Sequence, residues 1–170
     1  TLSGHPAVAV NGYPADSVVH ALNVLRLTPD LVVSGINEGQ NIGPFVPLSG
    51  TAGAARVASR NGIPAVAASQ GFGTPAGTAP DFPSGAAAVI DWVEDFRLGR
   101  AGPGFQVVAN LNAPSCDAGE IRGLVEVPTA TDFSSGTPHP SDCTSTKTEF
   151  VDDVDGFIHG FITLSDIGRG

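Results

Sequence analysis

Two short apolar runs, separated by a polar loop and an alanine-rich stretch, constrain the fold of this 170-residue chain more than any other feature. The first run ends at Ser34-Gly35, and its unbroken apolar character predicts a strand over residues 31–34 that is covered on both faces. Residues 49–60 then have a helical pattern that stops at Asn61-Gly62. Residues 63–69 form the second run. A strand, a helix and a strand in this order predict a parallel sheet with crossover connections.

The same alternation extends along the chain. We predict a short strand at residues 6–10, helices at 14–27 and 82–98, and a core strand at 105–111. Residues 121–127 and 146–151 alternate like antiparallel strands, and residues 157–164 read as a last strand. The predicted fold class is α/β, with a Rossmann-like three-layer parallel-sheet core over residues 1–112. That the first strands of this core are missing is implied only by the family resemblance described below. Residues 113–170 are expected to add an antiparallel β-hairpin extension and the final strand.

The polar loop between the first strand and the helix is the candidate binding site. Asn37 and Asn41 follow the strand end, and Ser49-Gly50-Thr51 stand directly before a run of small residues. Open α/β sheets bind ligands at the carboxyl ends of their strands, and a helix start offers free N–H donors to phosphate. We therefore predict that Asn41, Ser49, Gly50 and Thr51 bind phosphate. The alternative is that the asparagines stabilise turns and the hydroxyls cap the helix; capping and phosphate binding are compatible.

Charge, apolar run length and motif content argue against several function classes. A net charge of −9 with only eight lysines and arginines argues against binding a nucleic acid polymer through its backbone. No apolar run reaches the roughly 18 residues of a membrane span. A dinucleotide-binding oxidoreductase is a weak alternative, because no Gly-x-Gly-x-x-Gly block follows a strand. An anionic ligand on an acidic protein requires a local cation and oriented N–H dipoles.

Several blocks carry a family resemblance. SGINEGQNIG followed by LSGTAGAAR closely resembles the SurE family of survival-protein nucleotidases, which are metal-dependent phosphomonoesterases. GYPADSVVHAL, NGIPAVAAS, ANLNAP and DVDGFIHGFITLSDI are similar to further blocks of that family, in the same order. The resemblance implies hydrolysis of a small phosphomonoester such as a nucleoside monophosphate. It also implies a homodimer or higher homo-oligomer, with the contact in residues 113–170.

The resemblance implies a divalent metal, Mg or Mn, as cofactor. Family members bind it through two aspartates of an N-D-D-G block, a serine, and an asparagine that matches Asn37; an amide oxygen suits such a hard cation. The chain starts after the N-D-D-G block, so we expect the catalytic aspartates outside these 170 residues, in a longer protein or a separate piece. The family usually has Glu where Val57 stands. The alternative function is therefore a non-catalytic SurE-like binding module that has lost the metal site.

The two cysteines, Cys116 and Cys143, lie in the least regular part of the chain. They are either two free thiols or a disulfide, and the disulfide is favoured, because closing such a loop would contribute roughly 3 to 4 kcal/mol. A disulfide favours an oxidising compartment and a secreted protein. The family resemblance favours the cytoplasm instead, so the compartment stays open.

Overall fold

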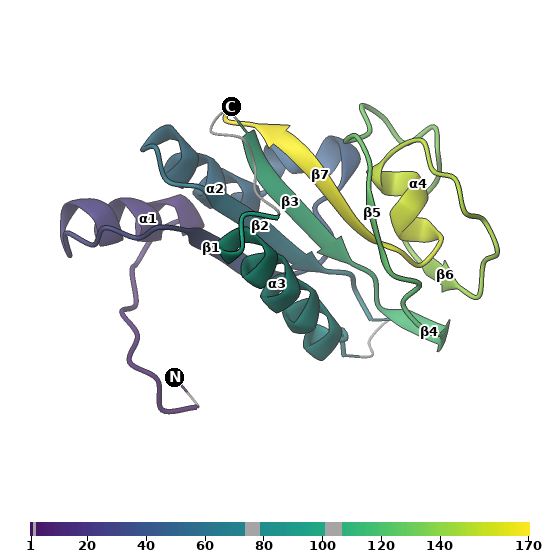
Figure 1. Ribbon diagram of the computed structural model, residues 1–170, viewed down its shortest axis with the longest axis horizontal. Helices are drawn as coiled ribbons and strands as arrows, with labels where there is room; N and C mark the ends of the chain where they lie inside the picture. Colours follow the sequence, from purple (N-terminus) through teal and green to yellow (C-terminus); the bar gives the residue numbers. More distant parts are fainter. Residues whose placement is uncertain (2, 74–78, 101–106) are drawn as a thin grey trace.

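The computed structural model describes residues 1, 3–73, 79–100 and 107–170, and it shows an α/β fold with helices on both faces of a five-stranded sheet (Figure 1). The helices are α1 (Pro14–Asn23), α2 (Gly50–Arg60), α3 (Phe82–Arg97) and α4 (Asp153–Ile158), with a 3-10 helix η1 (Gly43–Leu48). The strands are β1 (Val32–Glu38), β2 (Ala65–Gln70), β3 (Val107–Ala113), β4 (Cys116–Gly119), β5 (Leu124–Glu126), β6 (Ser141–Cys143) and β7 (Ile162–Gly168). The predicted helices at 14–27, 49–60 and 82–98 are confirmed, with the first one ending four residues early.

The main sheet has the strand order β1-β2-β3-β7-β5. Strands β1, β2 and β3 run parallel, whereas β7 is antiparallel to β3. In the parallel part, Asn37 pairs with Ser69 and Ser69 with Asn112. Three polar side chains therefore lie at one level, close to the carboxyl end of three neighbouring strands, which is the edge where open α/β sheets bind ligands.

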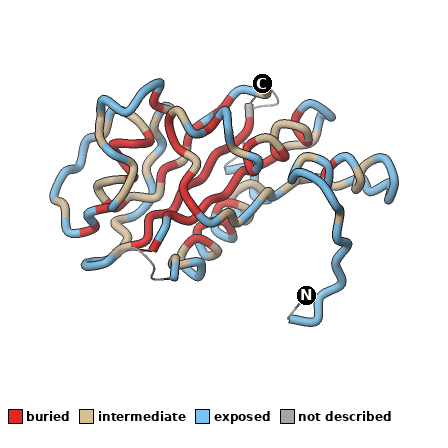
Figure 2. The backbone as a smooth tube through the Cα atoms, turned by 180° about the vertical axis from the view of Figure 1, so that it is seen from behind, coloured by how far each residue is buried: buried red, intermediate tan, exposed pale blue. Residues whose placement is uncertain are grey.

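Alternate residues of β2 enter two different hydrophobic clusters. Ala65 and Ala67 pack with the clustered side chains of α1 and α2, whereas Val66 and Ala68 pack with those of α3. Every residue of β2 is consequently buried, and the burial is continuous along the centre of the sheet (Figure 2). This explains why the strand reads as an unbroken apolar run rather than an alternation. The predicted α/β fold with three layers is confirmed.

The predicted strand at residues 6–10 does not form. These residues have no regular structure, are largely exposed, and lie on a segment that extends away from the body of the protein (Figures 1 and 2). Their β-favouring composition is not enough, because a strand needs a partner to satisfy its backbone groups. Among the described residues, none pairs with this segment.

The predicted antiparallel hairpin between residues 121–127 and 146–151 is wrong. Part of the first segment is β5, which instead pairs in parallel with β7 at the edge of the main sheet. The second segment contains no strand. It is held by the buried carboxylate of Asp155, which lies 2.7 Å from Lys147 Nζ and accepts a hydrogen bond from Val151 N at 3.1 Å. These side-chain contacts take the place of strand pairing.

The predicted last strand at residues 157–164 is displaced. Residues 153–158 form helix α4, and the strand begins only at Ile162. The side chain of Asp152 caps the helix by accepting a hydrogen bond from Asp155 N at 2.8 Å, and the acidic first turn complements the helix dipole. The alternation of apolar and polar residues in this stretch predicted a strand. The prediction was wrong for residues 157 and 158 because Asp152 caps a helix that begins at Asp153.

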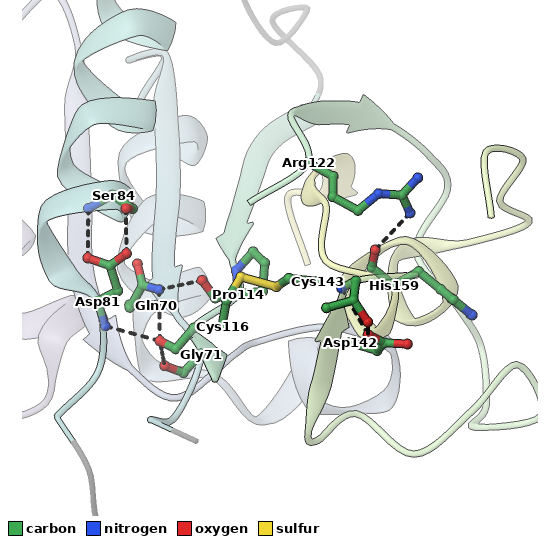
Figure 3. The surroundings of a disulfide bond; sticks show 12 residues. Gln70, Gly71, Asp81, Ser84, Pro114, Cys116, Arg122, Asp142, Cys143 and His159 are labelled. Carbon is green, nitrogen blue, oxygen red and sulfur yellow. Dashed lines mark hydrogen bonds between the residues drawn. A yellow bond between two sulfur atoms is a disulfide. The ribbon is translucent and has the colours of Figure 1, made fainter. Parts of the chain in front are cut away.

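A disulfide between Cys116 and Cys143 joins β4 to β6, which form a small parallel sheet (Figure 3). The residue before it, Ser115, donates a hydrogen bond to Gly71 O at 2.7 Å and accepts one from Asp81 N at 3.1 Å. The disulfide therefore connects the loop after β2 and the start of α3 to the C-terminal part of the chain. Within the described ranges, no helix is long and apolar enough to cross a bilayer.

Candidate functional site

β1 has a β-bulge or similar irregularity directly before Asn37. The register of β1 against β2 shifts between Ser34 and Asn37, and Gly35 lies inside the shift with a φ of 131°. A Cβ atom at Gly35 would lie 2.3 Å from the carbonyl oxygen of Ala68, so a larger residue would clash with the neighbouring backbone. Bulges of this kind turn side chains at the rims of sheets and occur next to active sites.

The amide of Asn37 is held in one orientation. Its Nδ2 donates hydrogen bonds to Glu38 O at 3.0 Å and to Gly39 O at 2.7 Å. Its Oδ1 accepts no hydrogen bond from the part of the chain that the structure describes. The side chain thus acts partly as a turn-stabilising asparagine, as the alternative interpretation expected. At the same time it leaves an oriented oxygen available to a ligand.

The loop after β1 is fixed to the sheet by Asn41. Its backbone N–H donates to Asn112 Oδ1 at 2.7 Å, and its carbonyl oxygen accepts from Asn110 Nδ2 at 2.9 Å. Its own Nδ2 donates to Ser69 Oγ at 2.7 Å. Asn110 and Asn112 are completely buried in β3, and their side chains fix the loop to the sheet through these hydrogen bonds. Asn41, which the sequence analysis predicts to bind phosphate, is therefore held rigidly at the carboxyl edge of the sheet.

Helix α2 begins beside this loop. The Oγ of Ser49 caps the helix by accepting from Ala52 N at 3.0 Å, and Ser34 Oγ donates to Thr51 O at 2.9 Å, which ties the first turn to β1. The first N–H groups of a helix have no intrahelical partner. Among the described residues, those of Gly50 and Thr51 find no acceptor. The helix start therefore keeps two backbone donors and a partial positive charge for an anion.

A cavity of about 280 Å³ lies between the loop and the helix start. Asn37, Asn41 and Ser49 all line it, so the structure brings the predicted metal ligand and two of the predicted phosphate ligands to one place. Gly50 and Thr51 do not line it; the side chain of Thr51 is buried, which leaves its N–H as the possible contact. A larger hollow of about 780 Å³ beside α3 and β7 contains none of the predicted residues.

The charge around the cavity is unsuited to phosphate without a cation. Glu38 lines the cavity, and no lysine or arginine is among the described residues that do so. A phosphate dianion would then approach a carboxylate, and the backbone dipoles of one helix start would have to offset both charges. A metal ion is the usual way in which a protein reverses the sign of such a site.

The chain offers the metal one oriented ligand. The Oδ1 of Asn37 fits a hard divalent cation by its chemistry and its freedom from other hydrogen bonds. In the described residues, no three His, Cys, Asp or Glu side chains gather in a way that could hold a metal. A complete metal site would therefore need further ligands besides Asn37, from residues outside the described part of this chain.

The sequence analysis assigned no role to several residues that build the site. Asn110 and Asn112 were seen only as part of a resembling block, although two asparagines at alternate positions of a buried strand are unusual and require partners. Gln40 was also missed: its Nε2 donates to Pro138 O and its Oε1 accepts from Phe72 N at 3.4 Å. A contact 98 residues apart along the chain leaves no local sequence pattern.

Asp153 anchors the other side of the loop. It is fully buried, and its carboxylate accepts hydrogen bonds from Gly43 N at 3.0 Å and Ala130 N at 2.8 Å. Burial raises the pKa of this carboxyl above its ordinary value, and the two N–H groups act in the opposite direction. The side chain thus links η1, next to the cavity, to the C-terminal half of the chain.

The comparisons with known proteins all point to the same family. The model of a family described as survival protein SurE matches residues 2–136. The 5'-nucleotidase SurE of Desulfatibacillum aliphaticivorans is 43% identical over 123 residues, covering 72% of this chain and 46% of that protein. The 5'-nucleotidase SurE of Methanospirillum hungatei is 41% identical over 130 residues, covering 71% and 46%. The chain spans about half the length of these curated relatives.

A solved structure shares the fold. The crystal structure of a SurE protein from Aquifex aeolicus superposes with a TM-score of 0.73 and 23% identity, covering 94% of this chain and 68% of that one. At this identity, the likeness concerns the arrangement of the sheet and its helices.

Proposed function

This chain belongs to the SurE family, and on that premise we propose that it forms part of a metal-dependent phosphomonoesterase that hydrolyses nucleoside monophosphates. The observation that carries the proposal is that Asn37 and Ser49 line one cavity at the carboxyl end of β1. One offers a free amide oxygen and the other stands at a helix start with free N–H groups. A cation and the phosphate oxygens would be held side by side there.

The residues of this chain would bind and orient the ester. Asn37 Oδ1 would hold the cation. Gly50 and Thr51 do not line the cavity itself, but their free N–H groups follow the lining residue Ser49 and would donate to a phosphoryl oxygen that extends toward the start of α2. The hydroxyl of Ser49, which caps α2 as an acceptor, can still donate its own proton to the phosphate. Such oriented donors stabilise negative charge as it builds on the phosphoryl group. When bound, the metal would polarise a phosphate oxygen and either activate water or position an attacking group.

Substitution of Asn37 in the full-length protein tests the proposal. We expect Asn37→Ala to lower metal-dependent kcat/KM for AMP by at least about 100-fold, or about 2.7 kcal/mol, because a ligand is lost. The fold should persist, since the two lost hydrogen bonds are local, to the neighbouring Glu38 and Gly39, and neither is fully buried. Asn11→Ala, at an exposed asparagine that does not line the cavity, is the matched control. Unchanged turnover in Asn37→Ala would remove this residue from the site.

The alternative is a binding module without catalysis. It is favoured by Val57, whose side chain packs against the cluster between α1, α2 and the sheet at the position where Glu was expected. Hydrolysis of p-nitrophenyl phosphate by the full-length protein tests this alternative. Activity that requires Mg²⁺ or Mn²⁺ and is abolished by a chelator would rule out a non-catalytic module.

Two further properties are proposed for the whole protein. Residues 113–170 would carry the contact of a homo-oligomer, and the disulfide would place the protein in an oxidising compartment. Sedimentation equilibrium of the full-length protein tests the first, and a monomer would refute it. Trapping of thiols in cell fractions tests the second, and a fully reduced natural protein would refute it.

A further inference from the structure

One wall of the candidate cavity is apolar and open. Phe45, Leu48 and Phe72 line it together with the asparagines, and their exposed fractions are 41%, 83% and 49%. We call these three side chains the aromatic wall. Three large apolar side chains around one hollow form the kind of exposed patch that marks a ligand or partner site. Neither the metal nor the phosphate accounts for them.

Phe72 is held in place without a ligand. Its ring lies against Gly39, where a Cβ atom would come within 2.6 Å of Phe72 Cζ and displace the ring. The ring of His139 meets it edge-on, with 6.3 Å between centroids and an angle of 87°. Its backbone N–H donates to Gln40 Oε1 at 3.4 Å. The aromatic face is therefore preorganised, which lowers the entropic cost of binding a flat group.

Phe45 is supported in the same way. Its ring packs against Phe133 with centroids 5.0 Å apart, and η1, which carries it, is anchored through the hydrogen bond from Gly43 N to Asp153. Phe133 and His139 both belong to residues 129–140 of the C-terminal half, which we name the crossing segment. It contacts the cavity residues Phe45, Phe72 and Gln40. The disulfide at Cys143 lies just beyond it.

The two walls of the cavity differ in chemistry. The polar wall, with Asn37, Asn41 and Ser49, suits a metal-bound phosphate, whereas the aromatic wall suits a flat apolar group. The volume of about 280 Å³ is slightly below the usual range for small-ligand pockets, roughly 300 to 1,000 Å³, so a large ester or a polymer would not fit inside. A small ligand with an anionic end and an aromatic end matches both walls.

We propose that Phe72, supported by Phe45 and Leu48, binds the base of the nucleoside monophosphate and thereby sets the preference for nucleotides over other phosphomonoesters. This inference rests on the proposed function and names a specificity-determining residue for it. Base stacking on an aromatic side chain is worth about 1 to 3 kcal/mol and tolerates different bases, since each has a π-face. The subsite should therefore select for a base without strongly selecting which one.

The kinetic test compares esters with and without a base in the full-length protein. We expect Phe72→Ala to raise KM for AMP at least about fivefold more than KM for ribose 5-phosphate, from the lower limit of stacking energy. Phe72→Trp should restore the AMP preference. Phe82→Ala, at a phenylalanine of 37% exposure outside the cavity, is the matched control and should change neither constant. Equal effects of Phe72→Ala on both esters would overturn the subsite.

Adenosine binding separates this inference from the proposed function. Adenosine has a base and no phosphate. Calorimetric titration of the protein with adenosine, compared with titration with ribose, therefore measures binding of the base to the aromatic wall even if the protein hydrolyses no ester. Adenosine binding that Phe72→Ala weakens at least about fivefold supports the subsite, and loss of hydrolysis alone would then count against the proposed enzyme. Wild-type protein that binds adenosine no better than ribose would overturn the subsite. p-Nitrophenyl phosphate distinguishes a nucleobase site from one for any aryl group, because AMP should have the lower KM.

Discussion

Replacing Asp153 by alanine should destabilise the protein by about 2 to 4 kcal/mol. The carboxylate is fully buried and accepts hydrogen bonds from Gly43 N and Ala130 N. Each buried donor left without a partner costs about 1 to 3 kcal/mol, which gives about 2 to 6 kcal/mol for the two. We expect the lower part of this range, because the desolvation penalty of the carboxylate itself disappears. Asp153→Asn keeps one acceptor and should lose about half as much.

Urea unfolding of the full-length protein, followed by circular dichroism, measures these differences. The midpoint should fall in the order wild type, Asp153→Asn, Asp153→Ala, with an unchanged slope. Asp91→Asn is the matched control: this aspartate is exposed on α3, and the change should stay within about 0.5 kcal/mol. A loss below about 1 kcal/mol for Asp153→Ala would refute the idea that its carboxylate ties η1 to the crossing segment.

The raised pKa of Asp153 adds a pH dependence with a definite sign. Burial lifts the folded-state pKa above the unfolded value of about 3.9, so the folded state binds the proton more tightly. The contribution of this group to stability is therefore greatest below the unfolded pKa and is lost as the pH rises through the folded pKa. The advantage of wild type over Asp153→Asn should shrink across that window. A difference that stays constant with pH, or that grows as the pH rises, would contradict the assignment.

Ser49 and the disulfide give two further predictions. Ser49→Ala should cost about 1 kcal/mol because Ala52 N loses its cap, whereas Ser49→Gly should cost only a few tenths. If the hydroxyl also binds phosphate, both variants should lose activity; full activity in Ser49→Gly would restrict this side chain to capping. Replacing Cys116 and Cys143 by serine should cost about 3 to 4 kcal/mol, because the closed loop spans a separation of 27 residues. Unchanged thermal unfolding of that variant would show that the disulfide does not constrain the chain.

The parts of the fold that sequence analysis predicted well are governed by local rules. Helix α2 follows a serine cap and ends at Asn61-Gly62, and helix α3 begins with Asp81 as its cap. The central strand β2 was predicted because burial on both faces leaves an unbroken apolar run. Capping and burial each leave a pattern within a few residues, so one sequence is enough to recognise them.

The C-terminal half was predicted poorly because its contacts are not local. The position of β5 beside β7 depends on which strand offers a free edge, and the path of residues 146–151 depends on the buried Asp155. Neither dependence is visible in an alternation of apolar and polar residues. The predicted strand at 6–10 failed for the same reason, since strand propensity does not supply a partner.

In the candidate site too, local features could be predicted from the sequence and long-range contacts could not. From the sequence alone, Asn37, Asn41 and Ser49 could be placed near a strand end and a helix start, because both positions follow from short motifs. The supporting contacts could not: Gln40 with Pro138 and Asp153 with Gly43 join residues about a hundred positions apart. The residue types and the order of strands and helices are thus a property of the sequence. The contacts that support the aromatic wall at Phe72 formed only when the tertiary structure brought residues 129–140 against Phe45, Phe72 and Gln40. Hydrogen bonds and ring contacts between distant segments depend on the three-dimensional path of the chain, which no local pattern encodes.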